Sequence, residues 1–176
     1  MRTGVSSAYT GIVDRLFLQA GEWVIITGAT GAIGLAAVQL SKKLGAKVIA
    51  LGSDSHGTGR LETVRQMGAD HVIDYVKNPE WAAMVKELTG GPGADCAFDA
   101  VGGDSFMQCV RGVGRGGRIV VEGFVAGFPL LPMNLVLVKG LYVCGPMTTF
   151  PPNPDAKEHR TERILGWMRE LAPHIS

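Results

Sequence analysis

Residues 24–34 read VIITGATGAIG, in which an apolar run leads directly into three glycines spaced by three, Gly28, Gly31 and Gly34. A helical apolar period follows. Glycine lets a strand turn sharply without a clashing β-carbon, so that backbone N–H groups and the positive end of the new helix can face a phosphate. The segment therefore predicts a seat for pyrophosphate, and a dinucleotide cofactor is the first hypothesis.

The rest of the chain repeats this strand and helix alternation. From Trp23 to about Leu171, short β-branched runs alternate with amphipathic segments of helical length, which is typical of βαβ units and a parallel sheet. We expect the α/β class with a doubly wound sheet of six parallel strands. The predicted strands are residues 23–27, 47–51, 71–73, 96–99, 118–122 and 141–144.

Capping residues mark the predicted helices between these strands. Gly45 is expected to cap the helix that follows the glycine loop, and Asn78–Pro79 to open another that the glycines of 90–93 end. Residues 130–138 are predicted to form a partly buried helix. A last helix is expected over 155–171, where Asp155 and Glu158 resemble a capping box.

Residues 1–20 are predicted to form a helix that connects from something before it, and residues 21–176 to form the cofactor domain. The length of 176 residues is that of one domain. Because the chain ends after a predicted helix without a closing strand, we expect a domain of a longer protein. A free-standing domain with a short N-terminal helix is the alternative.

Composition excludes several classes of partner. With 17 basic and 16 acidic side chains the formal charge is +1, which gives no field to hold nucleic acid or an anionic membrane. No apolar run is long enough to span a bilayer, and we expect a cytoplasmic protein. The three cysteines, Cys96, Cys109 and Cys144, are far apart, so neither a disulfide framework nor a metal site is predicted.

Five further motifs occur in order around the glycine loop. They are AGEWV at 20–24, AAVQL at 36–40, LGAKVIA at 44–50, GADHVIDY at 68–75 and FDAVGG at 98–103. Together they closely resemble the cofactor domain of zinc-independent medium-chain dehydrogenases/reductases, of the quinone oxidoreductase and 2-alkenal or prostaglandin reductase type. The resemblance covers about residues 5 to 172.

The resemblance implies a six-stranded Rossmann domain that binds NADPH and transfers hydride to a quinone or to an activated alkene or carbonyl compound. In whole family members this domain is paired with a GroES-like domain that forms the other wall of the active site. The 176 residues of this sequence do not include that second domain. No catalytic side chain is predicted within the chain. The resemblance also implies a homodimer through the edge strand at residues 141–144.

The residue at the end of the second strand indicates which cofactor binds. An acidic residue there would bind the ribose 2′-hydroxyl of NAD, whereas this chain has Gly52 followed by Ser53. Arg60 opens the next helix and could hold the 2′-phosphate of NADP. NADPH is therefore favoured over NADH, although Asp54 could turn inward as an NAD-type carboxylate.

The predicted cofactor contacts lie in the glycine loop and in the loops that follow the strands. Besides the residues just named, the resemblance implies that Tyr75 lies near the adenosine end and that the Met147 backbone reaches the carboxamide, and Gly123 and Phe124 are expected beside the nicotinamide half. The remaining predicted contacts are Thr30, Ala32, Ile33, Ala100, Val101 and Gly102. His71, Asp95 and Asp99 are interpreted as structural, the two aspartates as turn caps.

Two other functions remain open. A short-chain reductase shares the string Thr27-Gly28-x-x-Gly31-x-x-Gly34, but the Tyr-x-x-x-Lys pair of that class is missing. A non-catalytic nucleotide-sensing or assembly domain would keep the fold without the chemistry. Titration with NADPH and NADH separates these readings, because a pure scaffold binds neither.

Overall fold

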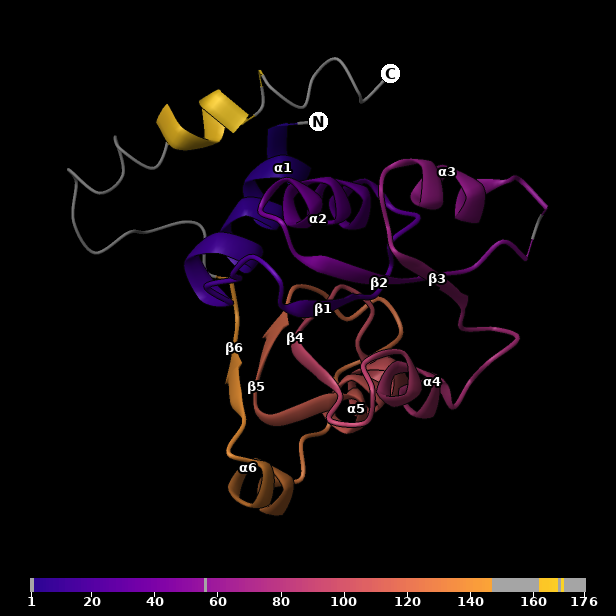
Figure 1. Ribbon diagram of the computed structural model, residues 1–176, viewed down its shortest axis with the longest axis vertical. Helices are drawn as coiled ribbons and strands as arrows, with labels where there is room; N and C mark the ends of the chain where they lie inside the picture. Colours follow the sequence, from indigo (N-terminus) through magenta and orange to yellow (C-terminus); the bar gives the residue numbers. More distant parts are fainter. Residues whose placement is uncertain (1, 56, 147–161, 168, 170–176) are drawn as a thin grey trace.

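A single parallel sheet runs through the protein, with strand order β3-β2-β1-β4-β5-β6 (Figure 1). The computed structural model describes residues 2–55, 57–146, 162–167 and 169. The strands are β1 Trp23–Ile26, β2 Lys47–Gly52, β3 His71–Asp74, β4 Ala94–Asp99, β5 Val113–Val121 and β6 Tyr142–Cys144. The predicted α/β class and six-stranded doubly wound sheet are confirmed.

Helices cover both faces of the sheet. They are α1 Arg2–Tyr9, the π-helical turn η1 Thr10–Arg15, α2 Ala32–Lys43, α3 Arg60–Gln66, α4 Trp81–Leu88, α5 Gly103–Gly112 and α6 Met133–Lys139. In Figure 1, α1, α2 and α3 lie on one side of the strands, and α4 and α5 lie on the other. Residues 162–167 are also helical.

Each face of the sheet has its own apolar core, because strands buried on both sides read as continuous apolar runs. Val24, Ile26 and Phe98 pack under α1 and α2, whereas Ile25 and Ile119 pack under α4 and α5. The order of strands reverses direction at the β1/β4 boundary. In such sheets ligands bind outside the carboxyl ends of the strands at this switch point.

Several predicted boundaries were wrong. The N-terminal helix ends in the π-helical turn at Arg15 rather than at residue 20. Pro79 does not begin α4, which starts at Trp81 after Glu80 as its N-cap residue. The fifth strand starts at Val113, five residues early, because residues between Val113 and Arg118 bulge out of register with β4.

The sixth strand lies at the edge of the sheet, as predicted, and α6 precedes it. The expectation of a partly buried helix at 130–138 is confirmed in burial, since Leu135 and Val136 are half-buried against the core, but the helix spans Met133–Lys139. Lys139 fastens this helix to the body of the domain, because its Nζ donates to the carbonyl oxygens of Val110 (2.6 Å) and Val113 (2.5 Å). The Val110 carbonyl belongs to the last turn of α5 and the Val113 carbonyl to the start of β5. Carbonyl groups at the end of a helix lack an intrahelical donor, so a lysine can bind them.

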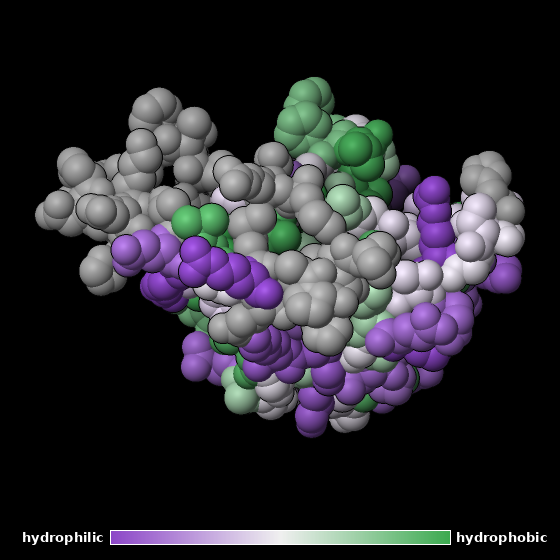
Figure 2. All heavy atoms as spheres, turned by 90° about the horizontal axis from the view of Figure 1, so that it is seen from above, coloured by the Kyte–Doolittle hydropathy of each residue, from purple (hydrophilic) through white to green (hydrophobic). Residues whose placement is uncertain are grey.

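Charged and polar side chains dominate much of the surface in Figure 2, with a compact group of apolar side chains at one rim. The most exposed large apolar side chains of the described residues are Val125, Leu137, Leu130, Phe128 and Met133. Within the described part of the chain, no helix is both long and apolar enough to cross a bilayer. The predicted last helix at 155–171 falls mostly outside the described residues.

Candidate cofactor-binding site

The glycine loop joins β1 to α2 in the conformation that its sequence predicts. Gly28 has a φ of 62°, a left-handed conformation that favours glycine. A β-carbon on Gly34 would lie 2.2 Å from the carbonyl oxygen of Gly28, so only glycine lets the helix start this close to the loop. The loop and the first turn of α2 are therefore packed as one rigid unit.

The first turn of α2 presents backbone N–H groups to solvent. Because Leu35 N donates to Gly31 O as the first intrahelical bond, the amides of Ala32, Ile33 and Gly34 have no helical acceptor. Gly31 and Ala32 are exposed. Free amides and the positive helix end together favour a phosphate at this position.

A cavity of about 570 Å³ lies over this turn. It gathers residues from four loops at the carboxyl edge of the sheet. They are Gly28, Thr30, Gly31, Ala32, Ile33, Gly34, Tyr75, Ala100, Val101, Val125 and Ala126. A further cavity of about 480 Å³ shares Tyr75, Val101 and Ala126 with it and extends between α4 and α5.

A buried carboxyl fixes the floor of the cavity at the switch point. Asp99 is fully buried at the end of β4, where Thr27 Oγ1 donates to its Oδ1 at 2.7 Å. The amides of Val101 (3.2 Å) and Gly102 (3.2 Å) donate to the same carboxyl group. Burial raises the pKa of Asp99, while these hydrogen bonds act in the opposite direction.

The network makes Asp99 a turn cap, as predicted, and also ties β4 to β1. Thr27 Oγ1 in turn accepts from the amide of Ala100 at 3.0 Å. Asp95 does not cap a turn: its Oδ2 accepts from the amide of Trp23 on the neighbouring strand at 2.8 Å. His71 is structural, since its ring stacks on Trp23.

The end of β2 lies against the glycine loop. Gly52 is buried, and a β-carbon there would lie 2.6 Å from Thr30 Cγ2. Ser53 follows it and is partly exposed, whereas Arg60 is fully exposed at the start of α3. Neither of these two lines the cavity over the glycine loop.

The carboxylate of Asp54 is directed at its own loop. It accepts from the amide of Thr58 at 2.8 Å and from the amide of Gly59 at 3.1 Å. The Thr58 hydroxyl donates to the same group at 2.9 Å. Asp54 thus closes the loop that leads into α3.

The loops after β4 and β5 pack on one another on the other side of the switch point. Gly102, with a φ of 74°, has no room for a β-carbon, which would lie 2.7 Å from the Cα of Phe124. Ala126 N donates to Val101 O at 2.9 Å and thereby brings the second loop over the first. Phe124 is exposed and its ring lies 4.8 Å, centroid to centroid, from that of Phe128.

The structure brings most of the predicted contacts together and leaves several outside the cavity. Nine of them line it: Gly28, Thr30, Gly31, Ala32, Ile33, Gly34, Tyr75, Ala100 and Val101. Gly52, Ser53, Arg60, Gly102, Gly123 and Phe124 lie around it without lining it. Met147 falls outside the described residues.

Sequence reasoning missed the loop residues Val125 and Ala126, which line the cavity, and the Thr27 hydroxyl beneath it. It also passed over the side chain of Glu122, whose Oε2 atom is buried and has no hydrogen-bond partner among the described residues. A glutamate at the end of a buried parallel strand was the available signal, because such positions are normally apolar.

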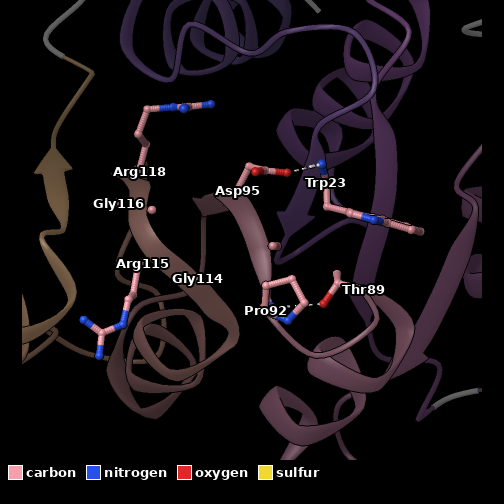
Figure 3. Close-up of a pocket in the computed structure, with 11 residues that line it drawn as sticks. Trp23, Thr89, Pro92, Asp95, Gly114, Arg115, Gly116 and Arg118 are labelled. Carbon is pink, nitrogen blue, oxygen red and sulfur yellow. Dashed lines mark hydrogen bonds between the residues drawn. The ribbon is translucent and has the colours of Figure 1, made fainter.

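Another cavity, also of about 570 Å³, opens at the opposite, amino-terminal edge of the sheet (Figure 3). In Figure 3 its two arginines, Arg115 and Arg118, point away from each other. Arg118 is engaged with Glu22 Oε2 at 2.6 Å. With no converging donors and no place at the switch point, this cavity is not the candidate site.

Metal binding has no support in the geometry of the described part of the chain. Within those residues, no group of three or more histidine, cysteine, aspartate or glutamate side chains could hold an ion. Burial raises the pKa of the Cys96 thiol to about 12 and that of Cys109 well above its usual value. These thiols are therefore packing groups rather than ligands or nucleophiles.

Comparison with known proteins agrees with the geometry. The sequence family described as zinc-binding dehydrogenase matches residues 32–161. A quinone oxidoreductase-like protein 2 homolog of Nematostella vectensis is 40% identical over 141 residues, which cover 79% of this chain and 37% of that protein. The chain therefore spans less than two fifths of that relative's length.

Solved structures share the fold over nearly the whole chain. A 2-haloacrylate reductase superposes with a TM-score of 0.84 at 23% identity, covering 97% of this chain and 52% of the other. Mycobacterial Rv1454c complexed with NADPH superposes with a TM-score of 0.82 at 23% identity, covering 95% and 51%. At such identities the likeness establishes the fold alone.

Proposed function

Because the chain belongs to the zinc-binding dehydrogenase family, we propose that it is the NADPH-binding part of an oxidoreductase that reduces quinones or activated alkenes. The family assignment confirms the resemblance to medium-chain dehydrogenases/reductases drawn from the sequence motifs. The observation that carries the proposal is the first turn of α2, whose free amides face a cavity at the switch point of the sheet.

The residues present fit a dinucleotide. Gly34 holds the helix start so close to the loop that a β-carbon has no space, and the exposed Ala32 and half-buried Ile33 of the first turn offer their backbone amides to a diphosphate. The adenosine half would lie toward Gly52 and Tyr75. The nicotinamide half would then lie over the ends of β4 and β5, near Ala100 and Gly123.

NADPH is favoured over NADH by the end of β2. Gly52 offers no carboxylate to a ribose 2′-hydroxyl, and Asp54 is engaged with Thr58 and Gly59. Arg60, exposed at the start of α3, provides a fork of donors for a 2′-phosphate. Mycobacterial Rv1454c, with the same fold, forms a complex with NADPH.

The acceptor class follows from the relatives. One is named a quinone oxidoreductase-like protein and another a 2-haloacrylate reductase, whose substrate is an activated alkene. When bound, the nicotinamide supplies a hydride, and a proton from solvent completes reduction of the acceptor by two electrons and two hydrogens. The residues of this chain bind and orient the cofactor, while the family's second domain would supply the other wall of the active site.

By itself, a chain of these 176 residues should bind cofactor but turn over slowly. Water would reach the nicotinamide, and nothing in the described residues orients an acceptor above it. A cytoplasmic location and the absence of a nucleic-acid partner stay predictions from the sequence.

A homodimer through the edge strand is part of the proposal. Tyr142 of β6 is exposed, and exposed Leu137 and Val138 of the adjacent α6 extend the same apolar surface. An unpaired strand edge next to apolar side chains favours pairing with a second chain. A two-fold axis beside β6 would make one continuous sheet.

Fluorescence titration with NADPH and NADH tests the function. We expect both to bind, NADPH the more tightly. A domain that binds neither would be a scaffold, and tighter binding of NADH would overturn the cofactor assignment. Single-turnover reduction of a quinone and of an enone by the cofactor-loaded protein then tests the acceptor classes.

A further inference from the structure

Glu122 directly follows the last residue of β5, Val121, at the carboxyl edge of the sheet. Asp99 pairs with Val121 in the β4/β5 register, which sets Glu122 beside Ala100, a residue that lines the cofactor cavity. The adjacent Gly123 touches Ala100 as well, since a β-carbon there would lie 2.8 Å from Ala100 O. Glu122 therefore adjoins the lining of the cavity, without lining it, on the side where the nicotinamide half is proposed to lie.

The side chain faces the α1 side of the sheet. Val120 lies in the core under α1 and α2, and residues two apart on a strand share a face. The Ser7 side chain of α1 lies close enough to the Glu122 carboxyl to lower its pKa. The N-terminal part of α1 also adjoins the phosphate seat, because a β-carbon on Gly4 would lie 3.6 Å from Ala32 O.

No cation neutralises this carboxyl among the described residues. Its Oε2 atom is buried without a hydrogen-bond partner, and burial raises the pKa of Glu122 to about 7, against a small opposing effect of Ser7. On β6 the neighbouring titratable group on this face is the Cys144 thiol, on which Arg15 of η1 acts. Asp99 on β4 belongs to the opposite face, where its charge acts on Cys109.

A partly buried carboxyl with one oxygen atom that lacks a hydrogen-bond partner is costly, and such groups cluster at functional sites. The nicotinamide ring carries a positive charge when oxidised and none when reduced. A carboxylate beside the ring therefore stabilises the oxidised form selectively.

We propose that Glu122 contacts the nicotinamide end of the bound cofactor and that its carboxylate binds NADP⁺ in preference to NADPH. This inference rests on the proposed function. The residue thereby tunes the bound cofactor toward hydride donation. Ser7 is its positioning residue and supports the ionised form. By linkage, NADP⁺ must in turn lower the pKa of the carboxyl, so that its binding releases a proton near neutral pH.

Isothermal titration of the whole chain with NADP⁺ and with NADPH tests this. Wild-type protein should bind NADP⁺ relatively better at about pH 8 than at about pH 6, with the affinity ratio changing about tenfold. Glu122→Gln should abolish that change, and Ser7→Ala should move its midpoint to higher pH. The ratio cancels effects common to both nucleotides, such as titration of the 2′-phosphate.

Proton release supplies an independent readout. At about pH 7, NADP⁺ binding to the wild type should release a fraction of a proton, seen as a dependence of the heat on the buffer's ionisation enthalpy. NADPH binding should not, and Glu122→Gln should show no release with either nucleotide. Glu87→Gln, the same change on the exposed face of α4, is the matched control and should behave as wild type.

The outcomes separate the two proposals. If neither nucleotide binds the wild type, the proposed function fails. If both bind and the ratio and proton release are the same in Glu122→Gln as in the wild type, the assignment of Glu122 is overturned while the proposed function stands. NADPH binding by each variant verifies that it is folded.

Discussion

Thr30 Cγ2 lies 2.6 Å from the point where a β-carbon on Gly52 would stand, so the glycine loop and the end of β2 close on each other without room for a side chain. The position that carries an acidic residue in NAD-binding domains is thus filled by a methyl group from the phosphate loop. Under the proposed function, cofactor choice and loop packing are coupled through this contact.

Introducing an acidic residue at position 52 should require removal of that methyl group. Gly52→Asp alone should weaken binding of both nucleotides, because the loop must shift to admit the side chain. The double variant Gly52→Asp with Thr30→Ala should recover NADH binding and lower NADPH affinity by about tenfold or more, since the carboxylate repels a 2′-phosphate. Fluorescence titration measures both, and equal effects of the single and double variants would refute the coupling.

The two glycines of the loop should separate folding from binding. Gly34→Ala places a β-carbon 2.2 Å from Gly28 O, so we expect a loss of about 1–3 kcal/mol in the free energy of unfolding and no nucleotide binding. In Gly31→Ala the nearest atom lies 3.4 Å away, so stability should change little while the added methyl group obstructs the diphosphate. Urea denaturation and nucleotide titration report the two effects, and wild-type NADPH affinity in Gly31→Ala would contradict the assigned seat.

Arg60 should discriminate the nucleotides by charge. Arg60→Ala is expected to weaken NADPH binding about tenfold and to leave NADH binding unchanged, because only the 2′-phosphate contacts the guanidinium. Arg65→Ala on the same helix, which breaks only the ion pair with Glu62, is the control. Parallel losses for NADPH and NADH in the Arg60 variant would mean that the side chain acts elsewhere.

Stability should depend on pH through Glu122. Its pKa is raised to about 7 in the folded protein from the usual 4.5, so the folded state favours the protonated form. This contribution is complete below about pH 4.5 and is lost as pH rises to about 7. Glu122→Gln should therefore be more stable than the wild type at about pH 8. The gain should be about 1–2 kcal/mol, because the group is only partly buried. At about pH 5 the free energies of unfolding of the two proteins should be closer to each other. Thermal unfolding across this pH range measures the difference in stability between Glu122→Gln and the wild type. A difference that grows as the pH falls would contradict the prediction.

The edge strand and α6 should hold the dimer together. Leu137 is 83% exposed on α6, so Leu137→Glu should leave the fold intact and shift the protein to monomer by charge repulsion across the two-fold axis. Met84→Glu on α4, which lies on the same face of the sheet but away from the edge strand β6 (Figure 1), is the control. Sedimentation velocity gives the state of each variant, and a wild-type protein that stays monomeric at high concentration would remove the dimer.

The sequence predicts strands and the glycine loop well because their signals are local. Runs such as Val24–Ile26 are apolar on both faces, and Gly28 and Gly34 occur where a positive φ or a close approach requires them. Gly45 likewise has a φ of 80° after α2, as its place at the end of an apolar period predicts.

Features that depend on distant contacts could not be predicted this way. The bulge in β5 follows from its register with β4, and Pro79 stands before rather than in α4 because the turn after Asp74 takes up the preceding residues. The proximity of Glu122 to Ser7, which lies far from it in the sequence, has no local signal. Val125 and Ala126 enter the cavity only because Ala126 N bonds to Val101 O.

The central claim is that the first turn of α2 binds the diphosphate of NADPH, and a crystal structure of the protein with saturating NADPH tests it most directly. We predict diphosphate oxygens within hydrogen-bond distance of the amides of Ala32 and Ile33, with the 2′-phosphate toward Ser53 and Arg60. A cavity over Gly28–Gly34 that stays empty of nucleotide, or a nucleotide bound at another edge of the sheet, would contradict the account.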